Sequence, residues 1–191
     1  PGIIHRLDKH TSGVMVIAKT NQAHQIIADQ FKNREVEKKY SGFTWGLWSE
    51  NNGSIDEPIS RNKKDPTRFQ VSIDGKKSQT IFTVEKKYRH CSLLSFYPST
   101  GRTHQIRVHA SHLGYPIFGD EKYGGGEQKT KGFLPEIAKF YKMEMKRFDR
   151  HALHARSLQF FHPLLDQKVT FEAPLPEEFR ALLKSFRSFY G

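Results

Sequence analysis

The order of strand-like and helix-like runs is the feature that most constrains how this chain folds. A short β-branched run at 13–18 is followed by a helical pattern that begins at Asn21. Several strand-like runs, a second helical pattern and a closing strand–strand–helix order come next. Because most strands follow one another directly, this order predicts an α+β fold with a mixed, largely antiparallel β-sheet flanked by helices and loops. We expect a single domain over 1–191, a length that can bury a sizeable core.

Local residue patterns place these elements along the chain. Aromatic and β-branched runs favour strands, clusters of Gly, Pro, Asn and Ser favour turns, and apolar spacings of three and four favour helices. We expect strands at 13–18, 36–48 and 90–98, in a hairpin over 67–88 that turns at Asp74-Gly75, and in a pair within 157–174, with a loop at 50–66. We expect helices capped by Asn21, over 103–113 with Gly114 as the stop, within 124–150, and over 174–186 with an inner face of Phe179, Leu182, Leu183 and Phe186.

An excess of cationic side chains indicates the kind of partner. The chain holds 31 Lys and Arg against 20 Asp and Glu, a formal net charge of +11. Such a surplus favours a polyanion, because cations that neutralise phosphates release counterions; solubility alone is the other interpretation. No apolar run approaches the roughly 20 residues of a membrane span, so we expect no membrane partner. The single cysteine, Cys91, excludes an internal disulfide and an all-cysteine metal site, and it predicts a reducing, cytoplasmic location.

Two short stretches carry side chains suited to chemistry near the expected strands. The first is the quartet His5-Arg6-Leu7-Asp8, placed just before 13–18. An Asp in this setting is usually a turn residue, although a polar segment at a sheet edge can also present a carboxylate. The second is Lys38-Lys39-Tyr40 in the strand expected at 36–48. A tyrosine in a strand is generally a packing residue with a polar tip.

A third stretch, 99–112, reads "STGRTHQIRVHASH" and predicts a helix with two distinct faces. Residues three and four apart share a face, so Ile106, Ala110 and Leu113 should face the core, whereas His104, Arg107 and Ser111 fall together on another side. That second face suits an anionic ligand or a catalytic carboxylate, and a solvated face is the other interpretation. Arg102 lies just before the helix, where backbone N–H groups can also meet a phosphate.

The histidines of the same stretch do not predict a metal site. His104, His109 and His112 are spaced by five and three residues, which does not bring them together well, and no acidic ligand lies nearby. We therefore expect no metal, and a hydrogen-bonded core histidine at His109.

Four stretches taken together resemble the RluA-type pseudouridine synthase family, whose members convert uridine to pseudouridine in ribosomal or transfer RNA. In chain order they read "HRLDKHTSGVMVIAKT", "VEKKYSGFTWG", "PSTGRTHQIRVHASHLGYPIFGDEKYGG" and "HALHARSLQFFHP". The resemblance runs over essentially the whole chain. It implies that Asp8 is the catalytic aspartate, that Tyr40 stacks near the target uracil, and that Arg107 pairs with the aspartate. It further implies that Arg6 enters the space left by a flipped nucleotide and that His5, Arg102 and His104 make RNA or structural contacts.

The resemblance also predicts what surrounds this site. Family members usually carry an upstream β-hairpin region with a Lys-Pro motif, and often an S4 RNA-binding domain. Because Pro1 lies almost on the catalytic motif, we expect a shortened catalytic domain that lacks these parts and exposes a sheet edge. Phosphate contacts are expected from Arg61, Lys63, Lys64 and Arg68, and from Lys129, Lys131, Lys142, Lys146 and Arg147, a run that is equally well explained as a solvated helix face.

The implied reaction needs no cofactor, because isomerising uridine requires neither a redox step nor a group donor. Asp8 can add to the ribose or to the base, or remove a sugar proton, and the residues leave these routes open. Two other functions remain as alternatives: a non-catalytic RNA-binding or ribosome-assembly module, and a metal-free ribonuclease that uses His104 or His109 beside Arg102. We expect a monomeric RNA pseudouridine synthase with RNA, ribosomal or transfer, as its partner.

Overall fold

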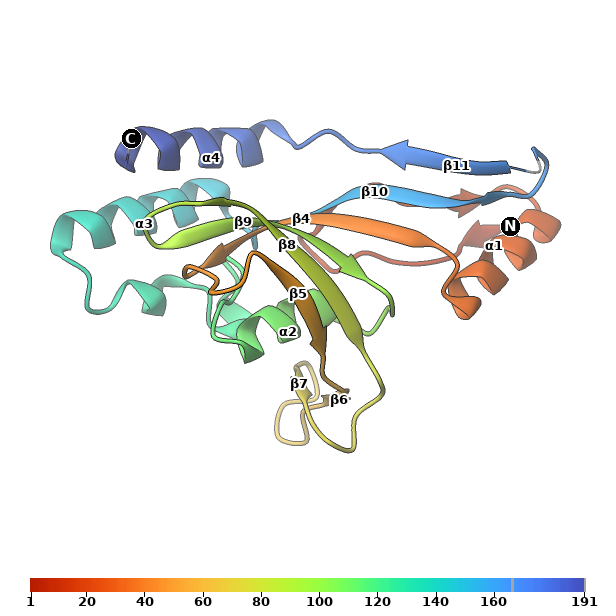
Figure 1. Cartoon of the computed structure of the whole chain (residues 1–191), viewed down its shortest axis with the longest axis horizontal. Coiled ribbons are helices and arrows are strands. Elements are labelled where there is room, and N and C mark those ends of the chain that lie inside the picture. Colours follow the sequence, from red (N-terminus) through yellow and green to blue (C-terminus); the bar gives the residue numbers. More distant parts are fainter. Residues whose placement is uncertain (166, 191) are drawn as a thin grey trace.

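The computed structural model describes residues 1–165 and 167–190 and centres on one twisted β-sheet (Figure 1). Its strands run in the order β11-β10-β4-β9-β8-β5, with β2 beside β10. The strands are β2 (Ser12–Gly13), β4 (Glu37–Trp45), β5 (Asn52–Asp56), β8 (Gln79–Lys87), β9 (Cys91–Pro98), β10 (Leu153–His162) and β11 (Gln167–Glu172). The pairs are antiparallel, apart from a parallel pair between β2 and β10. The expected α+β fold with a mixed, largely antiparallel sheet is confirmed.

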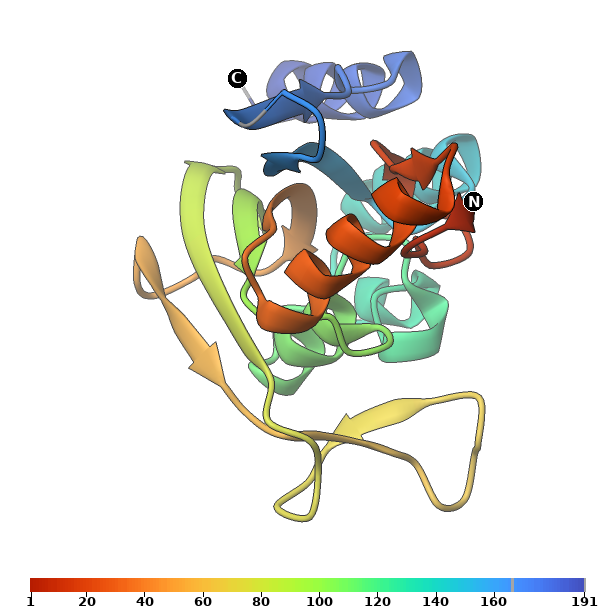
Figure 2. The same cartoon turned by 90° about the vertical axis from the view of Figure 1, so that its right-hand side faces the viewer.

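Helices and two small sheets surround this central sheet. The helices are α1 (Asn21–Asn33), α2 (Gln105–His112), α3 (Pro135–Phe148) and α4 (Glu177–Tyr190), with 3-10 turns η1 (Glu121–Tyr123) and η2 (Glu127–Thr130). One small sheet pairs β1 (Gly2–Ile3) with β3 (Ile17–Ala18), and the other pairs β6 (Ile59–Arg61) with β7 (Phe69–Val71). Figure 2 shows the β6–β7 hairpin projecting away from the body of the molecule. In the part of the chain that is described, no helix is both long and apolar enough to cross a membrane.

Aromatic side chains hold α4 and α3 against the sheet. Phe186 of α4 lies edge-on to Phe43 of β4, with ring centroids 4.8 Å apart, and packs near Tyr141 of α3. The inner face predicted for α4 is confirmed, because Phe179, Leu182, Leu183 and Phe186 are all buried. α2 buries Ile106 and Ala110 as expected, whereas Leu113 is 41% exposed because the helix has already ended at His112.

Most expected elements appear within a few residues of their predicted bounds. The strands expected at 36–48 and 90–98 are β4 and β9, the helix expected over 103–113 is α2, and the pair within 157–174 is β10 and β11, with β10 starting earlier at Leu153. Gly114 stops α2 with a φ of 84°. Part of the turn between β10 and β11, at Asp166, lies outside the described residues.

The buried strand expected at 13–18 is wrong. The chain forms only β2 and β3 there, and Ile17 is 57% exposed. After pairing with β10, the backbone turns at Gly13, whose φ is 126°, and crosses to pair with β1. A Cβ at Gly13 would lie 2.2 Å from the Ala155 carbonyl oxygen, so the close approach of the two backbones requires glycine.

Three other local predictions are also wrong. α1 is capped by Thr20, whose hydroxyl accepts a hydrogen bond from the Ala23 N–H at 3.1 Å, and not by Asn21. The expected loop at 50–66 contains β5 and β6. The expected hairpin over 67–88 keeps its turn, with the Gly75 N–H bonded to the Ser72 carbonyl, but its flanks do not pair with each other. β7 pairs with β6, whereas β8 pairs with β5 and β9.

Candidate active site

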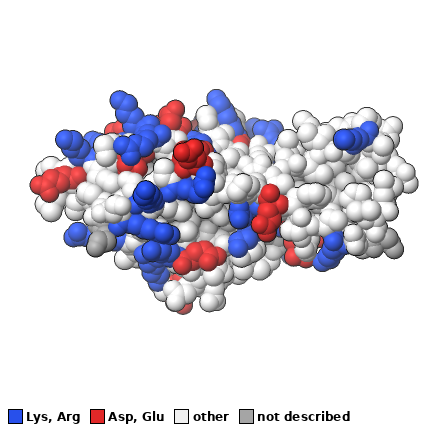
Figure 3. Space-filling view, turned by 90° about the horizontal axis from the view of Figure 1, so that it is seen from above, with Lys and Arg blue, Asp and Glu red and all other residues white. Residues whose placement is uncertain are grey.

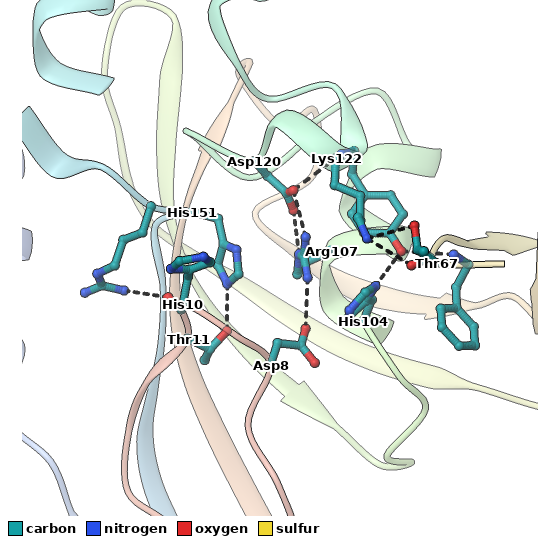
Figure 4. A network of polar contacts seen from close by, with 12 residues as sticks. Asp8, His10, Thr11, Thr67, His104, Arg107, Asp120, Lys122 and His151 are labelled. Carbon is teal, nitrogen blue, oxygen red and sulfur yellow. Dashed lines mark hydrogen bonds and ion pairs between the residues drawn. The ribbon is translucent and has the colours of Figure 1, made fainter. Parts of the chain in front are cut away.

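An ion pair connects two of the three predicted catalytic residues, Asp8 and Arg107. Asp8 lies in the loop between β1 and β2, and Arg107 projects from the first turn of α2. The Arg107 Nη1 donates to Asp8 Oδ2 at 3.3 Å (Figure 4). The Arg107 side chain is only 7% exposed and that of Asp8 is 22% exposed. The fold therefore brings together a carboxylate that stays accessible and a buried cation that lies 99 positions along the chain.

A second carboxylate, Asp120, fixes the guanidinium group of Arg107. Arg107 donates from Nε to Asp120 Oδ2 at 2.6 Å and from Nη2 to Asp120 Oδ1 at 2.9 Å, a bidentate pair. Burial alone would lower the pKa of Arg107, but the hydrogen bond and charge of Asp120, with Asp8 adding to them, raise it overall. Arg107 therefore stays charged and keeps one orientation, and its contact with Asp8 is the longer and looser of the two.

The accessible side of Asp8 faces a cleft at the end of β4 and β9. Tyr40 of β4 lines this cleft, and burial, followed by the charge of Asp8, raises the pKa of Tyr40 to about 12. Its phenol is therefore neutral at physiological pH, and its ring is available for stacking. The residues that line the cleft are Arg6, Leu7, Asp8, Thr11, Lys38, Tyr40, Pro98, Thr100, Gly101, Arg102, His104, Gln105, Ile106 and Leu153.

Lys38 adds a cation to the cleft whose charge depends on pH. Its Nζ donates to the Thr100 carbonyl at 3.3 Å. Burial, and next the charge of Arg34, lower the pKa of Lys38 to about 8. The cleft therefore carries one positive charge fewer when the pH rises above 8.

His104 is held in place at the edge of the cleft. Its φ of 57° is left-handed, and its Nδ1 lies 2.6 Å from the Tyr123 hydroxyl. The same hydroxyl accepts a hydrogen bond from the Phe69 N–H at 3.0 Å. Burial lowers the pKa of His104, although the negative charge of Asp8 opposes this shift. His104 also borders a second cavity of about 650 Å³ on the other side of Arg107.

The other residues predicted to contact RNA are dispersed. Arg6 is exposed at the cleft, and Arg102 lines it while donating from Nε to the Lys77 carbonyl at 3.3 Å. His5 does not line the cleft; it stacks on Phe31 of α1 with centroids 4.7 Å apart. Arg61 and Arg68 are exposed on the β6–β7 hairpin, where they lie over the rings of Phe69 and Tyr123.

The expected core histidine at His109 is confirmed. Its Nε2 lies 2.9 Å from the Glu57 carbonyl, so Nε2–H donates, and its Nδ1 accepts from the Thr80 hydroxyl at 2.9 Å. Within the described residues, no group of three or more His, Cys, Asp or Glu side chains is arranged to hold a metal ion.

Sequence reasoning missed Asp120, although it lies within one of the quoted stretches. An acidic residue before "EKYGG" looks like a turn or cap residue, and Asp120 does cap η1 by accepting from the Tyr123 N–H at 3.3 Å. No local pattern shows that the same carboxylate reaches back to Arg107. Only the packing of the 113–120 segment beneath α2 creates that contact.

Comparisons with known proteins indicate the family of the chain. Residues 1–112 match the family described as RNA pseudouridylate synthase. The chain is 41% identical over 187 residues to a Bacillus subtilis (strain 168) protein named Uncharacterized RNA pseudouridine synthase YlyB. It is 36% identical over 187 residues to the Ribosomal large subunit pseudouridine synthase D of Escherichia coli (strain K12). In both cases 98% of this chain is covered, but only 56% of the relative, so the chain spans about half the length of these proteins.

Solved structures show the same architecture. Human RNA Pseudouridylate Synthase Domain Containing 1 superposes with a TM-score of 0.75 at 27% identity, covering 95% of this chain and 72% of that one. Human RNA Pseudouridylate Synthase Domain Containing 4 superposes with a TM-score of 0.73 at 28% identity, covering 97% and 76%. Together with the family match over more than half of its residues, this similarity shows that the chain belongs to the RluA-type RNA pseudouridylate synthase family.

Proposed function

We propose that this chain isomerises uridine to pseudouridine in RNA, with Asp8 as the catalytic carboxylate. One observation carries the proposal: the Asp8 carboxylate contacts the buried Arg107 at 3.3 Å and opens onto a cleft that Tyr40 lines. An oriented carboxylate beside a fixed cation is the arrangement that general-base or nucleophilic chemistry needs. The family membership of the chain supports this choice of reaction over others that the same groups allow.

The reaction conserves every atom of the nucleoside. The bond between the ribose C1′ and the base N1 breaks, the base turns, and a bond forms between C1′ and C5. The proton on C5 leaves and N1 gains one, so the product is an isomer and the step requires no oxidant and no donor group. Asp8 acts by adding to the ribose or to the base, or by removing a sugar proton. In each route Arg107 orients the carboxylate and stays protonated itself.

The target base must leave its stack to reach Asp8. Unstacking and unpairing a nucleotide costs a few kcal/mol, which new contacts have to offset. The Tyr40 ring offers a stacking surface inside the cleft, and a neutral phenol avoids repulsion between its oxygen and Asp8. Arg6, exposed at the mouth of the cleft, is placed to fill the gap that the flipped nucleotide leaves.

The charge of the molecule supports RNA as the substrate. Figure 3 shows the face of the molecule that lies on top in Figure 1. Lys and Arg gather over the half of this face that carries α3 and α4, interspersed with acidic side chains, while the other half is mostly uncharged. With a net charge of +11, many cations are available for phosphates. Several relatives are named for the large ribosomal subunit, so we propose large-subunit ribosomal RNA as the first substrate to test and transfer RNA as the second. We propose a monomer acting in the cytoplasm, where the buried thiol of Cys91 stays reduced.

The two alternative functions have weaker support. A ribonuclease of this type needs an acid–base pair, yet both nitrogens of His109 are engaged inside the core and Nδ1 of His104 is bonded to Tyr123. A non-catalytic RNA-binding module does not need a buried Arg107 that is fixed by Asp120 and contacts the accessible carboxylate of Asp8. Both alternatives leave the arrangement around Asp8 without a purpose.

Replacing Asp8 tests the proposal directly. We expect Asp8→Asn to abolish pseudouridine formation in large-subunit ribosomal RNA while RNA affinity stays within about threefold, since Asn keeps the shape but cannot act as a base or nucleophile. Pseudouridine is measured by mass spectrometry of digested RNA, and affinity by filter binding. The exposed Asp74 supplies the matched control, Asp74→Asn. Substantial turnover by Asp8→Asn, or strand cleavage by the wild-type chain, would contradict the proposal.

A further inference from the structure

Two buried histidines, His151 just before β10 and His154 within it, contact the loop that carries Asp8, although neither lines the cleft. His151 Nε2 lies 2.7 Å from the Thr11 hydroxyl, and His154 Nδ1 lies 2.9 Å from the Ser12 hydroxyl. The histidines are only 5% and 2% exposed. Each therefore binds one of two successive hydroxyls at the end of the catalytic loop, and Figure 4 shows the His151–Thr11 contact beside Asp8 and Arg107.

The two histidines act as neutral hydrogen-bonding groups. Burial, and next the charge of Arg107, lower the pKa of His151 to about 3, and burial also lowers the pKa of His154. His154 Nε2 lies 3.1 Å from the Ala173 carbonyl, which can only accept, so Nε2 carries the proton. His154 Nδ1 is then the acceptor for the Ser12 hydroxyl. Because neither ring gains charge near neutral pH, these contacts do not depend on protonation of the histidines there.

The loop between Asp8 and these hydroxyls contains a strained residue. His10 has a left-handed φ of 72°, a conformation that is unfavourable for a non-glycine residue and persists only when its surroundings hold it. The Thr11 N–H closes a turn onto the Asp8 carbonyl at 2.9 Å, and Arg150 donates to the His10 carbonyl at 3.2 Å. If Thr11 is displaced, its hydrogen bond to the Asp8 carbonyl should therefore shift the backbone of Asp8 as well.

We propose that His151 and His154 are positioning residues that hold Thr11 and Ser12, and so set the Asp8 carboxylate against Arg107. The proposal rests on the catalytic role proposed for Asp8. It gives a purpose to the "HALH" stretch, whose histidines do not line the cleft, although His151 lines the cavity on the other side of Arg107. A reacting group displaced by about 1 Å can lose about 100-fold in rate, so a small shift of this loop is enough to matter.

The test compares two variants that each remove one hydroxyl bonded to a histidine ring. Thr11→Val removes the partner of His151, while Tyr141→Phe removes the hydroxyl that lies 2.6 Å from His90 Nδ1 in the core around α3. Thr11→Ser keeps the hydroxyl. The measurements are the single-turnover rate on unmodified ribosomal RNA, the RNA dissociation constant, and amide hydrogen exchange across 8–12.

We expect Thr11→Val to lower the rate about 10- to 100-fold, to leave RNA affinity within about twofold, and to speed exchange across 8–12. Thr11→Ser should recover most of the rate, and Tyr141→Phe should keep rate and exchange near wild type. An unchanged rate in Thr11→Val overturns the proposal. A wild-type chain that makes no pseudouridine overturns the proposed function instead. The positioning role is then tested by amide hydrogen exchange alone, and equal protection of 8–12 in wild type and Thr11→Val overturns it.

Discussion

Arg107 lies between two carboxylates that serve different ends. Asp120 is 2% exposed and binds the guanidinium group through two short contacts, whereas Asp8 makes one longer contact and remains open to the cleft. Because one carboxylate already balances the buried charge, Arg107 does not need a tight pair with Asp8 to be stable in the core. Asp8 is thereby oriented without being fully engaged, which leaves it available to react.

Lys38 gives the cleft a measurable dependence on pH. An unfolded lysine titrates near pH 10.4, and the folded pKa of Lys38 is about 8. Below pH 8 both states are charged and the full cost of burying the charge lowers the free energy of unfolding. Between pH 8 and about 10.4 the unfolded state binds more protons, so this cost disappears as the pH rises. We expect Lys38→Met to be more stable than wild type at pH 7, with the difference shrinking toward pH 10 in chemical denaturation.

The control for this measurement is Lys139→Met, at an exposed position of α3. RNA binding supplies a second readout, because wild-type affinity should fall as the pH rises through 8 and Lys38→Met should lack that step. A stability difference between wild type and Lys38→Met that stays constant from pH 7 to pH 10 contradicts the assignment.

Sequence reasoning predicted some residues of the site and not others. Asp8, Tyr40 and Arg107 were predicted because they stand in stretches that resemble a family, and the fold brings the three together. Asp120 and His151 stand in two of the same stretches, but the resemblance assigned neither of them a role. An Asp in a turn and a His in a strand are ordinary residues, and their contacts with Arg107 and Thr11 exist only after distant segments have packed.

At the scale of elements, the strongest local patterns were the most predictable. α4 combines Pro176 and two glutamates at its start with an apolar face of period 3.6, so no distant partner was needed to recognise it. β5 and β6 were missed because the polar stretch 50–66 contains few apolar residues, among them Ile55 and Ile59, and its strand form depends on β8 and β7 as partners. The choice between β7 and β9 as the partner of β8 is likewise set by tertiary structure.

The packing of α4 supports a prediction about stability. Phe186 is fully buried and contacts the rings of Phe43, Phe118 and Phe140. We expect Phe186→Ala to lower the free energy of unfolding by about 3–5 kcal/mol through lost contacts and a residual cavity. Phe171→Ala, at a position 48% exposed on β11, should lose clearly less in the same urea titration. If both variants lose the same free energy of unfolding, the packing of Phe186 does not contribute to stability as we expect.

At the scale of the whole molecule, the positive charge should govern RNA affinity. Each phosphate contact contributes a slope of about −0.7 to −0.9 in a plot of log affinity against log salt. With about three or more contacts, we expect affinity to fall at least about 10-fold between about 50 and 200 mM KCl. Arg61→Gln, on the projecting β6–β7 hairpin, should reduce the slope by about 1 if that hairpin reaches the RNA backbone. A flat salt response in filter binding contradicts the role assigned to the +11 charge.

The parallel pairing of β2 with β10 has a consequence for how activity appears during synthesis. The contact between Thr11 and His151 spans 140 positions, and closing so long a loop is entropically costly and slow. Asp8 therefore leaves the ribosome well before β10 does, and its surroundings are complete only when β10 has emerged. Until then the nascent chain carries its reactive carboxylate in an unorganised segment. The proposed activity should therefore appear only after β10 has been translated.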